Sequence, residues 1–301
     1  MNLAPIALFV YNRPEHTRRV LDSLRCNLLA AESDLVIFSD AARKSVHQLN
    51  VGLVRTLIRD VAGFRSVRIV ERERNLGLAS SIEDGVGRLC DEQGAVIVVE
   101  DDLMVSPEFL SFMNRALQRY RDEPRVMQIS GYMFPGTFES NADALFLPLI
   151  SCWGWGTWKR AWAYYDPRAT GFARLRANRA LREEFNVGGA YDYYHMLEQQ
   201  MQGEIDSWGI RWLLSVFLQQ GLVLYPVQSL VQNIGVDGSG THGAGVTCLQ
   251  TTLAHNTDRQ FSRLRLPDQI EVDNKAVDQV RATLRGVNPG ILIRVVRKLI
   301  G

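Results

Sequence analysis

The stretch Ala95-Val-Ile-Val-Val-Glu-Asp-Asp102 places five apolar residues directly before three carboxylates. An unbroken apolar run of this kind is typical of a strand that is covered on both faces, as in the parallel sheets of α/β proteins. Glu100, Asp101 and Asp102 then follow at the carboxyl end of the predicted strand. Because ligands of open α/β sheets bind beyond the carboxyl ends of the strands, these acids are the first candidates for a functional site.

Three adjacent carboxylates at one strand end repel one another, and a bound cation would relieve that repulsion. Carboxylate oxygens suit Mg²⁺ or Mn²⁺, and such an ion could bridge the acids and the two phosphates of a nucleotide-sugar. The alternative is a solvated acidic turn ahead of a helix near Pro107. The position after a buried central strand favours metal binding.

Further apolar runs rich in branched residues lie on both sides of this stretch. Between them, apolar residues recur at helical spacing, as after Pro14 with Val20, Leu21, Leu24 and Leu28. Alternating strands and helices predict an α/β fold with a Rossmann-like, mostly parallel central sheet flanked by helices. The predicted strands are Ile6–Tyr11, Leu35–Ser39, Val67–Val70, Ala95–Val99 and Val126–Ser130.

After about Ser130 this alternation weakens, and the chain becomes rich in aromatic residues and glycine. Helical spacing predicts three helices there, at Arg174–Glu184, Tyr191–Gln202 and Trp208–Gln219. The second half of the chain is therefore expected to be helix-rich and to pack on the sheet without an intervening linker.

The composition excludes several classes of protein. Of the 301 residues 46% are hydrophobic, which is enough for one large α/β domain. The 34 basic and 33 acidic residues leave no broad basic field of the kind that nucleic-acid binders present. With no CxxC pair, secretory leader or membrane-spanning run in view, we expect a cytoplasmic protein with no zinc site and with buried thiols. The four cysteines are Cys26, Cys90, Cys152 and Cys248.

The order of several motifs resembles that of the inverting GT-A glycosyltransferases, in particular the N-acetylglucosaminyltransferase I type, within the family 2-like enzymes. The stretch Val98–Phe109 (VVEDDLMVSPEF) is similar to the family's strand, EDD motif and helix entry. Phe9–Pro14 (FVYNRP) and Ile37–Asp40 (IFSD) are similar to its first two strand ends. Cys152–Trp158 and Ile205–Trp208 resemble its G-W and W-D-D-W segments. The similarity runs from about residue 4 to residue 245.

This resemblance implies a donor site at the strand ends. Asp102 matches the acid that binds the metal ion, which would be Mn²⁺ or Mg²⁺. Asp101 matches the acid that faces the ribose, and Glu100 the first acid near the donor. Arg13 matches an arginine near the diphosphate, and Asn12 precedes it where the family has Asp.

The resemblance also implies a base-reading residue and a catalytic base. Asp40 matches the residue that reads uracil, which points to a UDP-sugar as the donor. Asp206 matches the general base, within a motif that reads Ile205-Asp-Ser-Trp208 here. Because Asp is also a favoured helix N-cap, capping of the helix that starts at Trp208 is the structural alternative for Asp206.

Two further segments supply candidates. Trp153 and Trp155 are predicted to bind the acceptor, because aromatic faces stack on sugar rings, whereas Trp158 and Trp162 are expected in the core, on a helix. His242 lies in a glycine-rich stretch, residues 237–243, that resembles the family's loop over the bound donor, and it is a candidate donor contact.

The predicted organisation is a nucleotide-sugar-binding half at 1–135, an acceptor-binding and catalytic half of the same domain at 136–260, and a C-terminal extension at 261–301. In the extension, Arg294, Arg297 and Lys298 accompany an apolar strip within 290–301. That segment is either a peripheral contact with an anionic membrane or a helix docked on the domain.

The function implied is a metal-dependent hexosyl- or N-acetylhexosaminyl-transferase. It would move a sugar with inversion from a nucleotide diphosphate donor to a glycan or lipid-linked acceptor, in surface polysaccharide biosynthesis. One alternative is a sugar-1-phosphate nucleotidyltransferase, which is disfavoured because Asn12-Arg13-Pro14 stands where a glycine-rich phosphate loop belongs. Another is a non-catalytic carbohydrate- or nucleotide-binding protein of the same fold.

Overall fold

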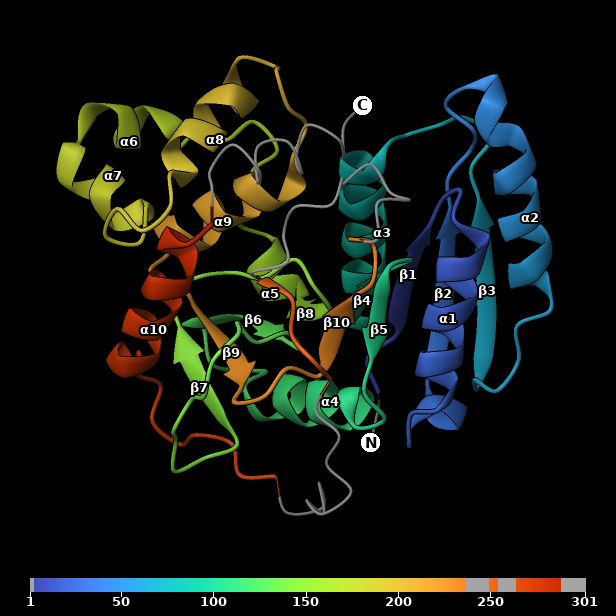
Figure 1. Cartoon of the computed structure of the whole chain (residues 1–301), viewed down its shortest axis with the longest axis horizontal. Helices are drawn as coiled ribbons and strands as arrows, with labels where there is room; N and C mark the ends of the chain where they lie inside the picture. The colour runs from blue at the N-terminus through green and yellow to red at the C-terminus, as the bar shows by residue number, and fades with distance from the viewer. Residues whose placement is uncertain (1–2, 237–248, 254–263, 288–301) are drawn as a thin grey trace.

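An eight-stranded sheet forms the centre of the computed structural model, which describes residues 3–236, 249–253 and 264–287 (Figure 1). The strands are β1 (Ile6–Val10), β2 (Asp34–Ser39), β3 (Ser66–Glu71), β4 (Ala95–Glu100), β6 (Val126–Ser130), β7 (Ala144–Leu147), β8 (Trp155–Trp158) and β9 (Leu222–Pro226). They lie in the order β3-β2-β1-β4-β8-β6-β9-β7.

The first four strands of this order run parallel, with β1 paired to both β2 and β4, and β2 paired to β3. The other half mixes directions. β8 is antiparallel to β4 and β6, β9 is parallel to β6, and β7 is antiparallel to β9. The predicted mostly parallel α/β fold is therefore confirmed. Strands from both sides of residue 135 share one sheet, because β8 lies between β4 and β6.

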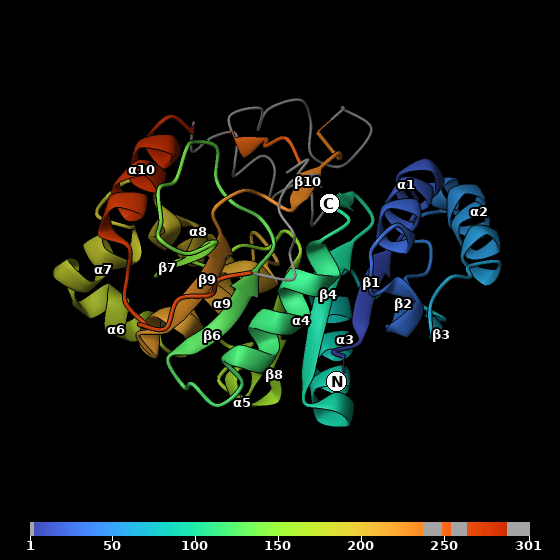
Figure 2. The same cartoon turned by 90° about the horizontal axis from the view of Figure 1, so that it is seen from below.

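Helices cover both faces of the sheet. They are α1 (Pro14–Arg25), α2 (Gln48–Arg59), α3 (Leu78–Gln93), α4 (Phe109–Arg119), α5 (Lys159–Trp162), α6 (Phe172–Ala177), α7 (Arg179–Phe185), α8 (Tyr193–Met201), α9 (Trp208–Leu218) and α10 (Asn274–Arg285). α1 and α2 lie side by side on one face, and α3 packs against β1 and β4 on the other (Figure 2). A separate two-stranded ribbon pairs β5 (Leu103–Val105) with β10 (Val231–Asn233).

The predicted strands match β1, β2, β3, β4 and β6 to within one residue at each end. α1 begins at Pro14, as expected, since the first helical turn needs no N–H from that residue. Leu28, however, lies beyond the end of α1 and is 72% exposed, so its predicted place in this helix is wrong.

Two predictions for the second half are corrected. The predicted helix Arg174–Glu184 is two helices, because Asn178 ends α6 and its side chain accepts a hydrogen bond from the Leu181 N–H to cap α7. The segment Trp155–Trp158 is strand β8, whereas a helix was expected. At Gly156 a Cβ atom would come within 3.0 Å of the Val96 carbonyl oxygen, so glycine permits the close pairing with β4.

Several other predictions concern the surface or the ends of the chain. Cys26 is exposed, contrary to expectation, whereas Cys90 is buried and Cys152 half-buried, and all three thiols are free. In the part of the chain that the structure describes, no helix has the length and apolar character needed to cross a membrane. Cys248, His242 and the segment 290–301 lie outside the described residues.

Candidate functional site

The three carboxylates lie where β4 leaves the sheet. Glu100 is the last residue of β4, and Asp101 and Asp102 form the following turn, each only 4% exposed. The β5–β10 ribbon then brings a second segment over this turn, where the Ile234 N–H donates to the Asp102 carbonyl at 2.8 Å. The acids are therefore covered by chain from 130 residues further on, which no local sequence pattern indicates.

Arg13 is the positive charge of this turn. Its Nη2 donates to the Asp101 carboxylate and, at 3.0 Å, to Asp102 Oδ2. Burial lowers the pKa of Arg13, but the charges of Asp101 and Asp102 outweigh burial and raise it above its ordinary value. Arg13 thus provides part of the positive charge that was expected beside the acids. The other terminal nitrogen, Nη1, is buried and has no hydrogen-bond partner among the described residues.

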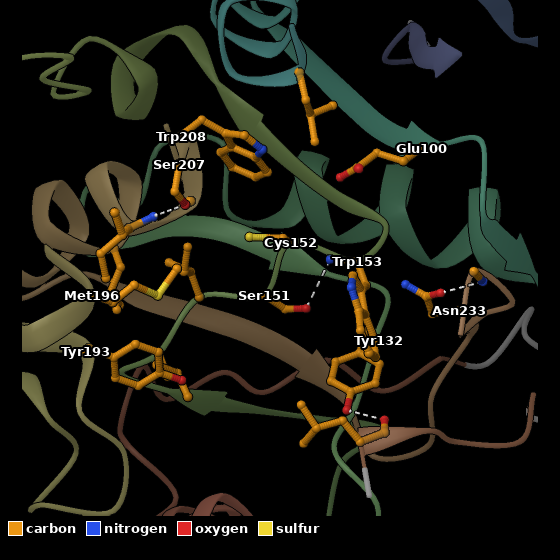
Figure 3. Close-up of a pocket in the computed structure, with 18 of the residues that line it drawn as sticks. Glu100, Tyr132, Ser151, Cys152, Trp153, Tyr193, Met196, Ser207, Trp208 and Asn233 are labelled. Atoms are coloured by element: carbon orange, nitrogen blue, oxygen red, sulfur yellow. Dashed lines mark hydrogen bonds between the residues drawn. The ribbon is translucent and has the colours of Figure 1, made fainter. Parts of the chain in front are cut away.

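Glu100 differs from its two neighbours because it has no arginine partner. Burial, followed by the charges of Asp102 and Asp101, raises its pKa well above the ordinary value, and Arg13 only partly opposes that rise. Its carboxylate points into a cavity that Trp153 and Trp208 also line (Figure 3). Glu100 therefore presents a half-buried carboxyl group without an arginine partner to that cavity.

The cavity has a volume of about 230 Å³ and lies between the carboxylate turn and the start of α9. Glu100 and Asp102 line one wall, and Asp206 lines another. Most of the remaining lining is apolar or aromatic, including Met196 and Leu213. The site thus combines a few carboxylates with a surface suited to the apolar faces of a ligand.

The two tryptophans predicted to bind an acceptor have different environments. Trp153 lines the cavity and stands edge-on to Tyr132, with ring centroids 4.7 Å apart. Trp155 is fully buried and packs between Trp162 and Trp208, so its prediction as an acceptor contact is wrong. Trp208, treated from sequence only as the start of a helix, lines the cavity.

Asp206 precedes α9 but does not cap it. The cap is Ser207, whose hydroxyl oxygen accepts from the Ile210 N–H at 3.3 Å. Asp206 Oδ1 instead accepts from Arg211 Nη2 at 2.7 Å, and the Asp206 side chain is 49% exposed. Its second oxygen, Oδ2, has no hydrogen-bond partner in the described chain. Capping of α9 by Asp206, the structural alternative to a catalytic role, is therefore excluded.

Asp40 is buried, and its carboxylate organises the turn before α3. It accepts at 2.9 Å from the backbone N–H groups of Leu76 and Gly77 and from Asn75 Nδ2. These bonds occupy both oxygens, so reading of a nucleobase by Asp40 stays a prediction. Asn12 is half-buried at the end of β1, next to Arg13, and its role also stays a prediction.

The carboxylates of this turn are candidate ligands for a divalent cation. Within residues 3–236, 249–253 and 264–287, no three His, Cys, Asp or Glu side chains converge as a metal site. Glu100 and Asp102 nevertheless offer oxygen ligands to one cavity, and Glu100 lacks a countercharge. Oxygen donors suit Mg²⁺ or Mn²⁺, which usually complete their coordination with water and substrate phosphates. The residues present therefore fit a cation that a bound diphosphate helps to hold.

Comparison with models of protein families and with curated proteins gives no match for this chain. Among solved structures, it is similar to S. aureus TarS 1–349, at 12% identity over 75% of this chain and 59% of that one, with a TM-score of 0.40. It is also similar to the mannosyltransferase PcManGT from Pyrobaculum calidifontis in complex with GDP-Man and Mn²⁺, at 11% identity, 54% and 48% coverage and a TM-score of 0.34.

A third similar structure is GalNAc-T7 with UDP, GalNAc and Mn²⁺, at 10% identity, 75% and 43% coverage and a TM-score of 0.43. The chain thus spans between 43% and 59% of the lengths of these three proteins. The narrower resemblance to the N-acetylglucosaminyltransferase I type stays a prediction. At such low identities and TM-scores the function has to be argued from the site itself.

Proposed function

We propose that this chain is a glycosyltransferase that moves a sugar from a nucleotide diphosphate donor to an acceptor hydroxyl. The observation that carries the proposal is the meeting of Glu100, Asp102 and Asp206 at one cavity. The first two lie at the carboxyl end of a central strand, where nucleotides bind in open α/β sheets, and Asp206 lies directly before Ser207, the cap of α9. A donor bound at the strand end would therefore have a carboxylate on its acceptor side.

The donor part of the proposal rests on the charges around β4. Arg13 Nη1 is buried and has no hydrogen-bond partner among residues 3–236, 249–253 and 264–287, so it could donate to a diphosphate oxygen. Glu100 and Asp102 would hold Mg²⁺ or Mn²⁺, which would neutralise the charge of the departing diphosphate. The donor we expect is a UDP-sugar that carries a hexosyl or N-acetylhexosaminyl group, and Asn12, Asp40 and Asp101 are its further candidate contacts.

Asp206 is the candidate general base. Transfer with inversion needs one base that takes the proton of the acceptor hydroxyl while the diphosphate leaves from the opposite face of the sugar. Asp206 is half-exposed at the cavity, and its Oδ2 is free to accept that proton. Inversion is part of the proposal because a single carboxylate suffices for it.

The acceptor is proposed to be a glycan or a lipid-linked sugar. Trp153 supplies an aromatic edge beside the cavity, and the apolar wall around Met196 suits the C–H face of a sugar ring or an adjoining apolar group. A place in surface polysaccharide biosynthesis and contact of the segment 290–301 with a membrane belong to the same proposal. Vesicle flotation of the full chain tests the membrane contact.

A thermal-shift panel tests the donor site, because a ligand that binds the folded state raises its Tm. The panel contains nucleoside diphosphates and their sugars, each with Mn²⁺ and with EDTA. We expect one nucleotide to raise Tm only in the presence of metal, and expect Asp102→Ala to remove that shift. The absence of any shift across the panel contradicts the proposal and favours a protein without nucleotide chemistry.

Product analysis then tests the reaction. Incubation of the identified donor with candidate acceptors, followed by NMR of the anomeric proton, distinguishes inversion from retention. Asp206→Asn should bind the donor normally and lose about 10²- to 10⁴-fold in turnover, as expected when a general base is removed. Normal turnover of Asp206→Asn means that another group is the base. Release of pyrophosphate from a nucleoside triphosphate and a sugar phosphate indicates a nucleotidyltransferase instead.

A further inference from the structure

Arginines are concentrated in one segment of the helix-rich half, residues 168–182. Five of these fifteen residues are arginine and none is Asp or Glu, whereas 34 of the 301 residues in the chain are lysine or arginine. Glu183 and Glu184 follow, so the segment keeps a net positive charge even when both are included. The five arginines are Arg168, Arg174, Arg176, Arg179 and Arg182.

The segment forms α6 and α7, which lie with α8 at one end of the molecule, opposite α2 (Figure 1). Arg182 holds the two helices together, because its Nη1 donates to the carbonyls of Leu175 and Arg176 at 2.9 and 2.6 Å. Its guanidinium also lies over the Tyr194 ring of α8, 5.3 Å from the centroid. Phe172 stacks on the same ring, with centroids 5.7 Å apart. Arg182 is therefore part of the scaffold.

The other four arginines are exposed, and none forms an ion pair with a carboxylate of the described chain. Elsewhere on the described surface an exposed arginine such as Arg65 pairs with a carboxylate, in this case Asp34. The acid directly before the segment, Asp166, accepts hydrogen bonds from the backbone N–H groups of Arg168 and Thr170. The four guanidinium groups can therefore bind an anion from outside the chain. We call Arg168, Arg174, Arg176 and Arg179 the arginine surface.

The arginine surface suits an extended anionic partner. None of its side chains lines the cavity of the candidate site, so a donor diphosphate bound there is not its partner. α6 and α7 are each about 10 Å long, which is close to the Debye length of about 8 to 10 Å at physiological ionic strength. The four charges therefore act together. A second copy of the chain is disfavoured, because a two-fold interface through this surface would bring arginines against arginines.

We propose that the arginine surface binds the phosphate head groups of an anionic lipid bilayer. A guanidinium group binds phosphate through two parallel hydrogen bonds. A bilayer presents its phosphates in a plane, which lets all four exposed side chains reach one without converging on a point. This contact is separate from the segment 290–301 and does not depend on the transfer reaction. α8 links it to the candidate site, since Tyr194 stacks on α6 and Met196 lines the cavity.

Co-sedimentation of the full chain with lipid vesicles tests this contact. Vesicles of phosphatidylcholine are compared with vesicles of equal parts phosphatidylcholine and phosphatidylglycerol, without donor or metal. We expect wild type to bind the anionic vesicles and not the neutral ones. It should be released when salt is raised from about 0.1 M to about 1 M, since the Debye length falls from about 10 to about 3 Å.

A quadruple variant removes the arginine surface and should lose roughly 10³-fold in its partition coefficient on anionic vesicles. It carries Arg168→Gln, Arg174→Gln, Arg176→Gln and Arg179→Gln. Circular dichroism checks that it is folded. If it is not, a double variant with Arg174→Gln and Arg179→Gln serves instead and should lose roughly 30-fold.

The matched control removes four exposed arginines that each face a carboxylate elsewhere on the molecule. It carries Arg25→Gln, Arg59→Gln, Arg65→Gln and Arg68→Gln. The quadruple variant and the control have the same net charge, and both keep the segment 290–301. A difference between them therefore shows where the charge acts. The control should bind anionic vesicles nearly as well as wild type.

A loss of binding confined to the quadruple variant supports the proposal. It is overturned if wild type does not bind anionic vesicles, if the quadruple variant binds as wild type does, or if the control loses as much. Binding of wild type to soluble inorganic polyphosphate without binding to vesicles also overturns it and assigns the surface to a soluble phosphate polymer. Donor thermal shifts are measured without lipid, so failure here leaves the proposed transfer function standing.

Discussion

Two pairings of arginine with carboxylates lie on different walls of the cavity, and they differ in how much water reaches them. At the carboxylate turn, Arg13 holds Asp101 and Asp102, which are each 4% exposed. At the start of α9, Arg211 holds Asp206, whose side chain is 49% exposed. The buried arrangement fixes charge in place, whereas the open one leaves a carboxylate oxygen free to exchange a proton. Under the proposed function, the same residue types would serve donor binding at the carboxylate turn and proton transfer at Asp206.

The largest expected effect on stability comes from breaking the buried arrangement. Arg13→Met removes the only arginine partner that the described chain gives Asp101 and Asp102, and leaves buried carboxylates without compensation. Breaking a buried pair in this way costs about 3 to 5 kcal/mol. Urea unfolding of Arg13→Met and Arg211→Met should show the larger loss for Arg13→Met. If Arg13→Met loses less free energy of unfolding than Arg211→Met, the comparison is contradicted.

Gly235→Ala perturbs the same carboxylate turn, because Gly235 packs against Asp102 and Arg13. A Cβ atom at Gly235 would collide with Asp102 Oδ2 and come within 3.0 Å of Arg13 Nη1. Overpacking of this kind costs about 1 to 3 kcal/mol, and it should also weaken nucleotide binding, since Arg13 is a proposed contact of the diphosphate and Asp102 a proposed metal ligand. Gly52→Ala is the control, because nothing lies within 4 Å of its Cβ position on α2. Unchanged donor affinity in Gly235→Ala would falsify the proposed place of the diphosphate.

Glu100→Gln should stabilise the ligand-free protein while it impairs the site. Burial, with Asp102 and Asp101 nearby, raises the folded-state pKa of Glu100 above its ordinary value of 4.5. The folded chain therefore binds more protons than the unfolded chain above that pH, and wild type loses stability as the pH rises. The variant should melt at a higher temperature than wild type at pH 8 in EDTA, whereas the two proteins should have the same Tm at pH 4. A lower Tm at pH 8 contradicts this prediction.

The smallest effect is expected at an exposed pair, which extends the comparison to the surface. Hydrogen bonding from Arg65 lowers the pKa of Asp34 from 3.8 to about 2. Its contribution to stability is therefore present above about pH 4 and is lost as the pH falls towards 2. Asp34→Asn should lower Tm by no more than about 2 °C at pH 7, because surface pairs contribute little. The difference in Tm between wild type and Asp34→Asn should become smaller as the pH is lowered from 7 to 3.

The parallel half of the fold and its turn could be predicted because their signals are local. Each strand from β1 to β4 carries its own apolar run, and the polar residues that end β1 and β4 meet at one edge of the sheet. The resemblance implied one donor site for Arg13 and these acids, and the direct contacts of Arg13 with Asp101 and Asp102 are a finding of the structure. β8 escaped prediction because Trp-Gly-Thr-Trp is four residues long and its neighbours in the sheet are distant in sequence.

The contacts of Arg211 with Glu83 and Asp206 escaped prediction for a related reason. Glu83 and Arg211 are 128 residues apart, and neither stands in a motif that links them. A usable signal was present in the α9 sequence WGIRWLLSVFL, where a single charge stands among apolar residues. A charged group in such a helix is rarely buried without a partner. That pattern predicts an ion pair for Arg211 but does not identify Glu83 or Asp206 as its members.

The place of β8 between β4 and β6 has a consequence for the synthesis of the chain. β4 ends at Glu100, but the strand that covers its open edge begins at Trp155, 55 residues later. At about 5 to 20 residues per second, the ribosome needs roughly 3 to 11 s to add them. During that interval the emerging β1–β4 sheet presents an uncovered apolar edge that can pair with another nascent chain. Yield in the cell should therefore depend on chaperones that shield this edge until β8 arrives.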